Sequence, residues 1–250
     1  MKLEIYFMEN QMSEMKVYTH YYKAKDAKST EFRWRTLLQF GKSWDIIGSV
    51  VMKNPGSSKP KVKDANGAAI SISDENILVK LREFNDLKIM WYEFKPDNTM
   101  ACVKELFQKY YEPKELNGVI QIFNIFYIKD AILNNATKKD KKDFFEDSKK
   151  MDIKCPFKNN KEFEEKVLKK DFENLKIPIY LGFADFGTNE KYKERCKDFF
   201  EKAKDRGMKY CSEKFADNKF YHPLYLMRYG KNKPECEKVL QCFINSKHKD

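Results

Sequence analysis

Short apolar runs along the chain predict buried β-strands. Residues 45–52, 118–124 and 177–183 are rich in β-branched and aromatic side chains and lack the alternation of a half-exposed strand. A fourth strand is predicted at 208–211. Apolar residues at helical spacing between and after these runs predict the helices 74–84, 99–111, 161–172, 190–206 and 234–243. Asp97 or Asn98 is predicted to cap the helix 99–111.

The alternation of strands with helices predicts the fold class. It indicates a single α/β domain over residues 1–250, a three-layer sandwich around a four-stranded, mainly parallel sheet. The first forty residues contain the strand-like stretch 16–22 and the aromatic and basic stretch 32–35. They are interpreted as an extended lead-in that precedes the sheet.

Composition supports a folded protein outside the membrane. Of the 250 residues, 42% are hydrophobic and 15% aromatic, which is enough for a core. No stretch reaches the roughly 18 apolar residues of a membrane helix, and the N-terminus lacks the apolar core of a secretory signal. We therefore expect a cytoplasmic monomer without a membrane partner.

Charge and cysteine content narrow the ligand classes. With 49 basic and 38 acidic residues, the net charge of 49 − 38 = +11 suits a polyanionic ligand, although AT-rich coding sequence also raises lysine content. The six cysteines form no C-x-x-C pair and are accompanied by only three histidines, so no metal site is predicted. Six reduced thiols, some of them in the core, are expected.

Polar residues follow each predicted strand, where ligands of parallel sheets bind. They are Asn54 in Asn-Pro-Gly, Asn124 in Phe-Asn-Ile-Phe, Phe186-Gly187, and His222 in His-Pro-Leu-Tyr-Leu. Each has a structural alternative: a turn, a backbone hydrogen bond, a helix entry or a packed histidine. Their shared position at strand ends is more informative than any one of them.

Together these motifs resemble the uracil-DNA glycosylase superfamily. Asn54-Pro55-Gly56 resembles the first motif of the mismatch-specific thymine/uracil branch, which holds the attacking water. His222-Pro223-Leu224-Tyr225 is similar to the second motif, a loop beside the flipped base. Asn124 stands in the place of the asparagine that reads the base, and Phe186-Gly187 in that of a Trp-Gly pair.

An uncharacterised bacterial domain family with Asn-Pro-Ser and His-Pro-Leu-Tyr-Leu motifs is also similar, over roughly residues 33–230. The chain departs from it at Gly56, where that family has Ser, and at Phe186, where it has Trp. Residues 57–96 look like an insertion relative to it. Asn54 replaces the aspartate of the fastest uracil enzymes, which removes one means of stabilising a cationic sugar.

The resemblance implies a monofunctional DNA glycosylase that needs neither a metal nor an organic cofactor. Asn54 would orient the water and His222 would donate a hydrogen bond to the departing base. Asn124 would read the edge of the base, and Phe126 or Phe186 would stack on it after base flipping.

DNA contact is expected from the loop after the first motif and from the second motif. The loop residues are Ser57, Ser58, Lys59, Lys61 and Lys63, which suit phosphates. Leu224 and Tyr225 would fill the gap left by a flipped base. A solvated lysine-rich loop and a buried core pair are the structural alternatives.

Gly56 also suggests the substrate. Uracil-specific relatives carry a Tyr two positions after the catalytic residue, which blocks substituents at C5, whereas Gly56 has no side chain. The sequence thus predicts a 5-substituted pyrimidine, such as a hypermodified base of viral DNA, and a role in antiviral defence. The alternative is a catalytically inactive nucleic-acid- or nucleotide-binding module on the same scaffold.

Overall fold

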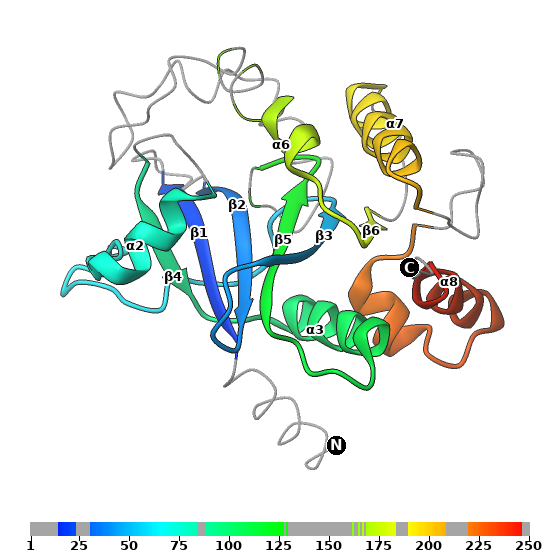
Figure 1. The fold of residues 1–250 in the computed structure, drawn as a ribbon. Coiled ribbons are helices and arrows are strands. Elements are labelled where there is room, and N and C mark those ends of the chain that lie inside the picture. The colour runs from blue at the N-terminus through cyan, green and yellow to red at the C-terminus, as the bar shows by residue number, and fades with distance from the viewer. Residues whose placement is uncertain are drawn as a thin grey trace.

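A six-stranded sheet organises the protein (Figure 1). The computed structural model describes residues 15–23, 31–84, 89–127, 129, 162, 165, 167, 169–183, 190–208 and 220–246. The strand order is β4-β1-β2-β5-β3-β6. The bounds are β1 Lys16–Lys23, β2 Glu31–Phe40, β3 Ile46–Met52, β4 Trp91–Phe94, β5 Gly118–Asn124 and β6 Ile179–Gly182.

The sheet is mixed, with an antiparallel and a parallel part. Strands β4, β1, β2 and β5 pair antiparallel, whereas β3 pairs parallel with both β5 and β6. The prediction of an α/β protein is confirmed, but a four-stranded, mainly parallel sheet is wrong in strand number and direction. The three apolar runs do form β3, β5 and β6. Of the fourth predicted strand, Met208 lies outside any strand and 209–211 lie outside the described residues.

The predicted lead-in is instead part of the sheet, and that interpretation is wrong. Strands β1 and β2 occupy inner positions, and nearly all their side chains are buried. Val17 and Tyr21 belong to the main core, whereas Tyr18 packs in a second cluster with α2 on the other face. The strand-like character of 16–22 is confirmed, but the segment was placed ahead of the sheet, whereas β1 and β2 are inner strands covered on two sides.

A β-bulge in β2 sets which side chains share a face. Arg35 has a φ of 45°, and the β1–β2 register shifts between Tyr18 and His20. The extra residue moves Thr36 to the face that already carries Arg33, because side chains otherwise alternate. Both residues line the cavity described below.

Helices cover the sheet on two faces (Figure 1). Helix α2 is capped by Asp74 and packs Leu81 near Tyr18, whereas α3, capped by Asp97 as expected, packs Leu106 and other side chains into the main core. The remaining predicted helices match α7 and α8 and, in part, α6. The bounds are α2 Glu75–Arg82, α3 Asn98–Tyr111, α6 Lys169–Asn174, α7 Glu190–Asp205, the π-helix η4 Tyr225–Tyr229 and α8 Pro234–Ile244.

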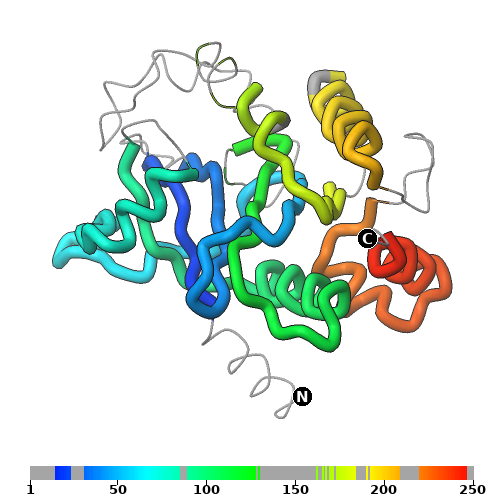
Figure 2. Tube along the Cα trace, in the orientation of Figure 1, coloured from blue at the N-terminus to red at the C-terminus, as the bar shows by residue number. Residues whose placement is uncertain are grey.

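The C-terminal helix packs beside α3 through aromatic side chains. The Phe243 ring lies 5.4 Å from that of Phe107 and 5.3 Å from that of Tyr180, both nearly edge to face. Figure 2 shows the resulting position of the red C-terminal segment next to the green helix. These contacts anchor the segment that follows His222.

Residues 57–96, expected as an insertion, supply an edge strand and a helix of this fold. Strand β4 pairs with β1, and α2 follows the loop. The loop also pairs with β4, because the Lys61 N–H donates to the Glu93 carbonyl at 2.8 Å and the Lys95 N–H to the Lys59 carbonyl at 2.9 Å. The loop after the first motif is therefore held against the sheet.

The cysteines differ from the expected six thiols. Cys102, Cys196 and Cys236 are buried thiols that form no disulfide, as predicted for core thiols, but Cys242 is disulfide-bonded. In the described part of the chain, no helix has the length and apolar character to cross a membrane.

Buried His20 predicts that stability falls in mild acid. Its Nδ1–H donates to the Met90 carbonyl at 2.9 Å, its ring lies 3.7 Å from that of Trp91, and burial lowers its pKa from 6.5 to about 3. The unfolded chain therefore binds a proton that the folded chain rejects, so this stability is complete above about pH 6.5 and is lost toward pH 3.

We expect His20→Phe to reduce the loss of unfolding free energy between pH 7 and pH 5 by about 2 kcal/mol. Urea denaturation of both proteins at each pH measures this difference, independently of any loss of stability at pH 7. Equal pH dependence in the two proteins would contradict the assignment.

Candidate functional site

One small cavity brings together four residues that the sequence predicted for the site, although His222 follows no strand in the described structure. Asn54, Gly56, Asn124 and His222 all line it. Its volume is about 20 Å³, and a single water needs about 10–15 Å³, so it has room for about one water molecule. The other lining residues are Arg33, Thr36, Met52, Pro55, Asp97, Thr99, Met100 and Ile122.

Parallel pairing of β3 and β5 places the two asparagines. Met52 is the partner of Asn124, and the pairing continues beyond the strands. The Ile125 N–H donates to the Met52 carbonyl at 2.9 Å, and the Phe126 N–H donates to the Lys53 carbonyl at 3.0 Å. Asn54 and Asn124 therefore leave the same edge of the sheet from adjacent strands.

Asn124 is buried with an unsatisfied acceptor. Its side chain is 1% exposed, and its Oδ1 has no hydrogen-bond partner. Such a group costs about 1–3 kcal/mol, and native proteins rarely retain one without a reason. Since Asn124 lines the water-sized cavity, this acceptor can receive a hydrogen bond from a small polar group there.

Strand β6 holds the His222 loop in place. The Tyr180 hydroxyl donates to the Tyr221 carbonyl at 2.6 Å. A Cβ on Gly182 would lie 2.8 Å from Cδ of Pro223, so the strand and the loop touch closely at a residue without a side chain. The His222 carbonyl then accepts the Leu226 N–H at 2.9 Å and begins the final helical segment.

His222 is neutral at physiological pH. Burial lowers its pKa to about 4; Asp97 opposes this shift and Lys53 adds to it. The Leu224 N–H donates to Nδ1 at 3.3 Å, so the proton of the neutral ring resides on Nε2. His222 can thus donate one hydrogen bond from Nε2.

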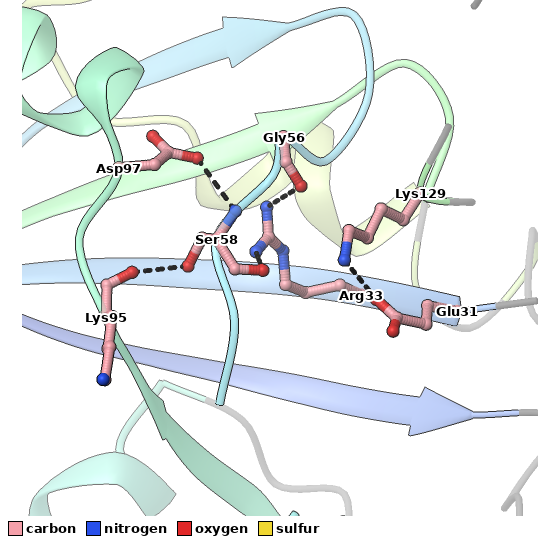
Figure 3. A network of polar contacts seen from close by, with 7 residues as sticks. All are labelled: Glu31, Arg33, Gly56, Ser58, Lys95, Asp97 and Lys129. Atoms are coloured by element: carbon pink, nitrogen blue, oxygen red, sulfur yellow. Dashed lines mark hydrogen bonds and ion pairs between the residues drawn. The ribbon is translucent and has the colours of Figure 1, made fainter. Parts of the chain in front are cut away.

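Arg33 is a site residue that the sequence interpretation missed (Figure 3). Its guanidinium donates to the Ser58 carbonyl at 3.3 Å and to the Gly56 carbonyl at 3.4 Å, and its Nε is buried without a partner. Burial lowers its pKa, whereas the carboxylates of Asp97 and Glu31 act in the opposite direction. No local sequence pattern indicated a role for Arg33 in the site, because the first forty residues were interpreted as a lead-in before the sheet.

Asp97 was predicted only as a helix cap, and the structure also places it at the cavity. One oxygen accepts the Met100 N–H at 3.0 Å, and the other accepts the Ser58 N–H at 3.2 Å. Among the described residues that line the cavity, it is the one carboxylate. Asp97 therefore joins the start of α3 to the loop after the first motif (Figure 3).

Gly56 does not border the open space that the sequence predicted at this position. A Cβ added there would lie 2.9 Å from Oδ2 of Asp97, closer than real contacts of this kind. The missing side chain therefore makes room for the Asp97 carboxylate. A Tyr at position 56 would displace this carboxylate before it blocked a base.

Phe126, the one predicted aromatic contact that the structure describes, does not line the cavity. Phe126 is 1% exposed and stacks on Tyr192, with 5.5 Å between the ring centroids, so it belongs to the core beside α7. Phe186 lies outside the described residues. Leu224 and Tyr225 are half-buried against the core, which matches their structural alternative.

The residues predicted to contact DNA divide into two groups. Ser57 is exposed, but Ser58 is buried, and its hydroxyl donates to the Lys95 carbonyl at 2.6 Å. Lys59 and Lys63 line a groove of about 710 Å³, which Lys23 and Lys129 also border. Lys61 instead pairs with Glu93 at 2.6 Å and does not line this groove.

Comparison with known proteins adds no relative: no protein-family model, curated protein or solved structure matches the chain. Within the described ranges, no group of three or more His, Cys, Asp or Glu side chains could hold a metal ion.

The environment of His222 predicts its titration. In a ¹H–¹⁵N spectrum of the imidazole groups, we expect His222 to be the neutral Nε2–H tautomer at pH 6 and to titrate near pH 4. His222→Gln identifies its signals by their loss. A His222 that titrates near 6.5 would contradict this buried, neutral state.

Proposed function

We propose that the protein is a DNA glycosylase that hydrolyses the N-glycosidic bond of a flipped pyrimidine and leaves an abasic site. The observation that carries this proposal is the convergence of Asn54, Asn124 and His222 on one water-sized cavity. The parallel strands β3 and β5, with Asn54 and Asn124 at their carboxyl ends, support a uracil-DNA-glycosylase-like arrangement for this half of the sheet.

Each of the three side chains suits one part of the reaction. The Asn54 carboxamide orients the attacking water toward the anomeric carbon. The neutral His222 donates from Nε2 to the base oxygen on which negative charge develops. The free Oδ1 of Asn124 accepts a hydrogen bond from the edge of the base.

The cavity has room for the attacking water but not for the base. A volume of about 20 Å³ does not hold a pyrimidine ring. The base therefore enters when the Asn54 loop and the His222 loop move apart, as loops do in many enzymes that close around a substrate.

The groove beside the loop is the proposed path of the DNA backbone. Lys23, Lys59 and Lys63 have no ion pair in the described structure, whereas Lys129 pairs with Glu31. Free ammonium groups attract phosphates without reading sequence. The groove thus favours a polyanion over an uncharged ligand.

The proposed substrate class is a 5-substituted pyrimidine, including hypermodified bases of viral DNA, which would make the protein a defence enzyme. Gly56 lacks the Tyr that blocks C5 in the uracil-specific enzymes, although the Asp97 carboxylate takes the space of its missing side chain. Polar side chains form part of the wall of the lysine-lined groove, among them Lys59, Asn66 and Ser71, and these can form hydrogen bonds with a hydroxyl-rich substituent.

We expect Asn54→Ala to abolish base release and to leave DNA binding nearly unchanged, because Asn54 positions water and does not hold phosphate. Duplexes with unmodified cytosine, uracil, 5-hydroxymethylcytosine or glucosylated 5-hydroxymethylcytosine are treated with alkali after incubation, and strand scission reports abasic sites. Fluorescence anisotropy measures binding of the same duplexes.

The outcomes separate the enzyme from its alternative. Binding without abasic sites on any duplex would identify an inactive nucleic-acid-binding module. Equal loss of binding and release in Asn54→Ala would contradict the role given to Asn54. Preferred release of uracil would contradict the substrate class alone.

The groove predicts that substitutions of neighbouring lysines affect DNA binding unequally. We expect Lys59→Gln with Lys63→Gln to weaken DNA binding and to lower the slope of log Kd against log salt by about 2, roughly 1 for each phosphate contact. Lys61→Gln is the matched control, because Lys61 pairs with Glu93. A salt slope that responds equally to Lys61→Gln would contradict the proposed path.

A further inference from the structure

We propose that Asp97 is a catalytic residue of this site: its carboxylate stabilises the positive charge on the deoxyribose and accepts a proton from the attacking water. This inference rests on the proposed glycosylase function and deepens it. It assigns the negative charge that the reaction needs to a residue outside the resembling motifs.

The position of Asp97 fits this role. It lines the same cavity as Asn54, Asn124 and His222. An ionised carboxylate has about four acceptor positions, and the N–H groups of Met100 and Ser58 account for two of them. Those two bonds fix the carboxylate and leave acceptor capacity for a water in the cavity.

The charges around the cavity leave this function to Asp97. Asn54 is an uncharged amide, and His222 is neutral because burial lowers its pKa to about 4. Arg33 lines the same cavity as a buried cation, and the Asp97 carboxylate opposes the lowering of the Arg33 pKa by burial. Gly56 permits this arrangement, since a Cβ would lie 2.9 Å from Oδ2 of Asp97.

The step balances with water as the only co-reactant. The bond between the anomeric carbon and the base nitrogen breaks, and its electron pair leaves with the base, which accepts a hydrogen bond from His222. The water oxygen bonds to the anomeric carbon while one of its protons passes to Asp97. Asp97 then returns the proton to solvent, and the base anion takes a proton from solvent.

Asp97→Asn separates this chemistry from the capping role. Asn retains a side-chain oxygen for the α3 N-terminus but removes the charge. We expect the single-turnover rate of base release to fall by about 100-fold or more, with the DNA Kd close to that of the wild type. The melting temperature falls, because the amide nitrogen of the variant meets one N–H donor and Arg33 loses an opposite charge, so the rates are compared at a temperature at which both proteins are folded. Asp74→Asn is the matched control, because Asp74 caps α2 in the same way and does not line the cavity.

Each outcome decides the proposal. A wild-type rate in Asp97→Asn, or parallel losses of binding and release, would show that Asp97 only supports the structure. If Asp97→Asn does not fold, Asp97→Ser, which also caps helices, replaces it with the same expected result. A wild-type protein that releases no base overturns the glycosylase function itself, and this inference with it.

Discussion

The buried guanidinium of Arg33 is the interaction on which the site depends. Removing a charge from water costs several kcal/mol unless the protein replaces its solvation. Here the carbonyls of Gly56 and Ser58 accept its N–H groups, its guanidinium lies 5.3 Å from the ring centroid of Phe94, and Asp97 provides opposite charge. The contacts that compensate the Arg33 charge therefore hold the loop after the first motif over β2 and against α3.

The cavity lies where the antiparallel and parallel parts of the sheet meet. The parallel strands β3 and β5 bring Asn54 and Asn124 together, while Arg33 comes from β2, whose bulge also turns Thr36 toward the cavity. Asp97 arrives from the chain that follows edge strand β4. The parallel part thus contributes neutral amides and the antiparallel part contributes charge, so neither part forms the site alone.

Burial gives the two kinds of polar site different properties. At the cavity it keeps His222 neutral and leaves Oδ1 of Asn124 without a partner, which favours directional hydrogen bonds to a small group. Along the groove, Lys59 and Lys63 are exposed and keep their charge in water, which favours non-directional attraction to phosphates. This division suits a protein that holds a polymer weakly at many points and acts on it at one.

Local patterns in the sequence determined the strands β3, β5 and β6, the helices α2, α3, α7 and α8, the Asp97 cap and the polar residues that follow the strands, because short-range periodicity and capping depend on neighbours in the chain. Only the tertiary structure decided that β1 and β2 lie inside the sheet, that Phe126 packs away from the cavity, and that Arg33 and Asp97 belong to it. Strand pairing and the compensation of a buried charge depend on residues that are distant in sequence. The hydrophobic periodicity of a short segment therefore does not predict them.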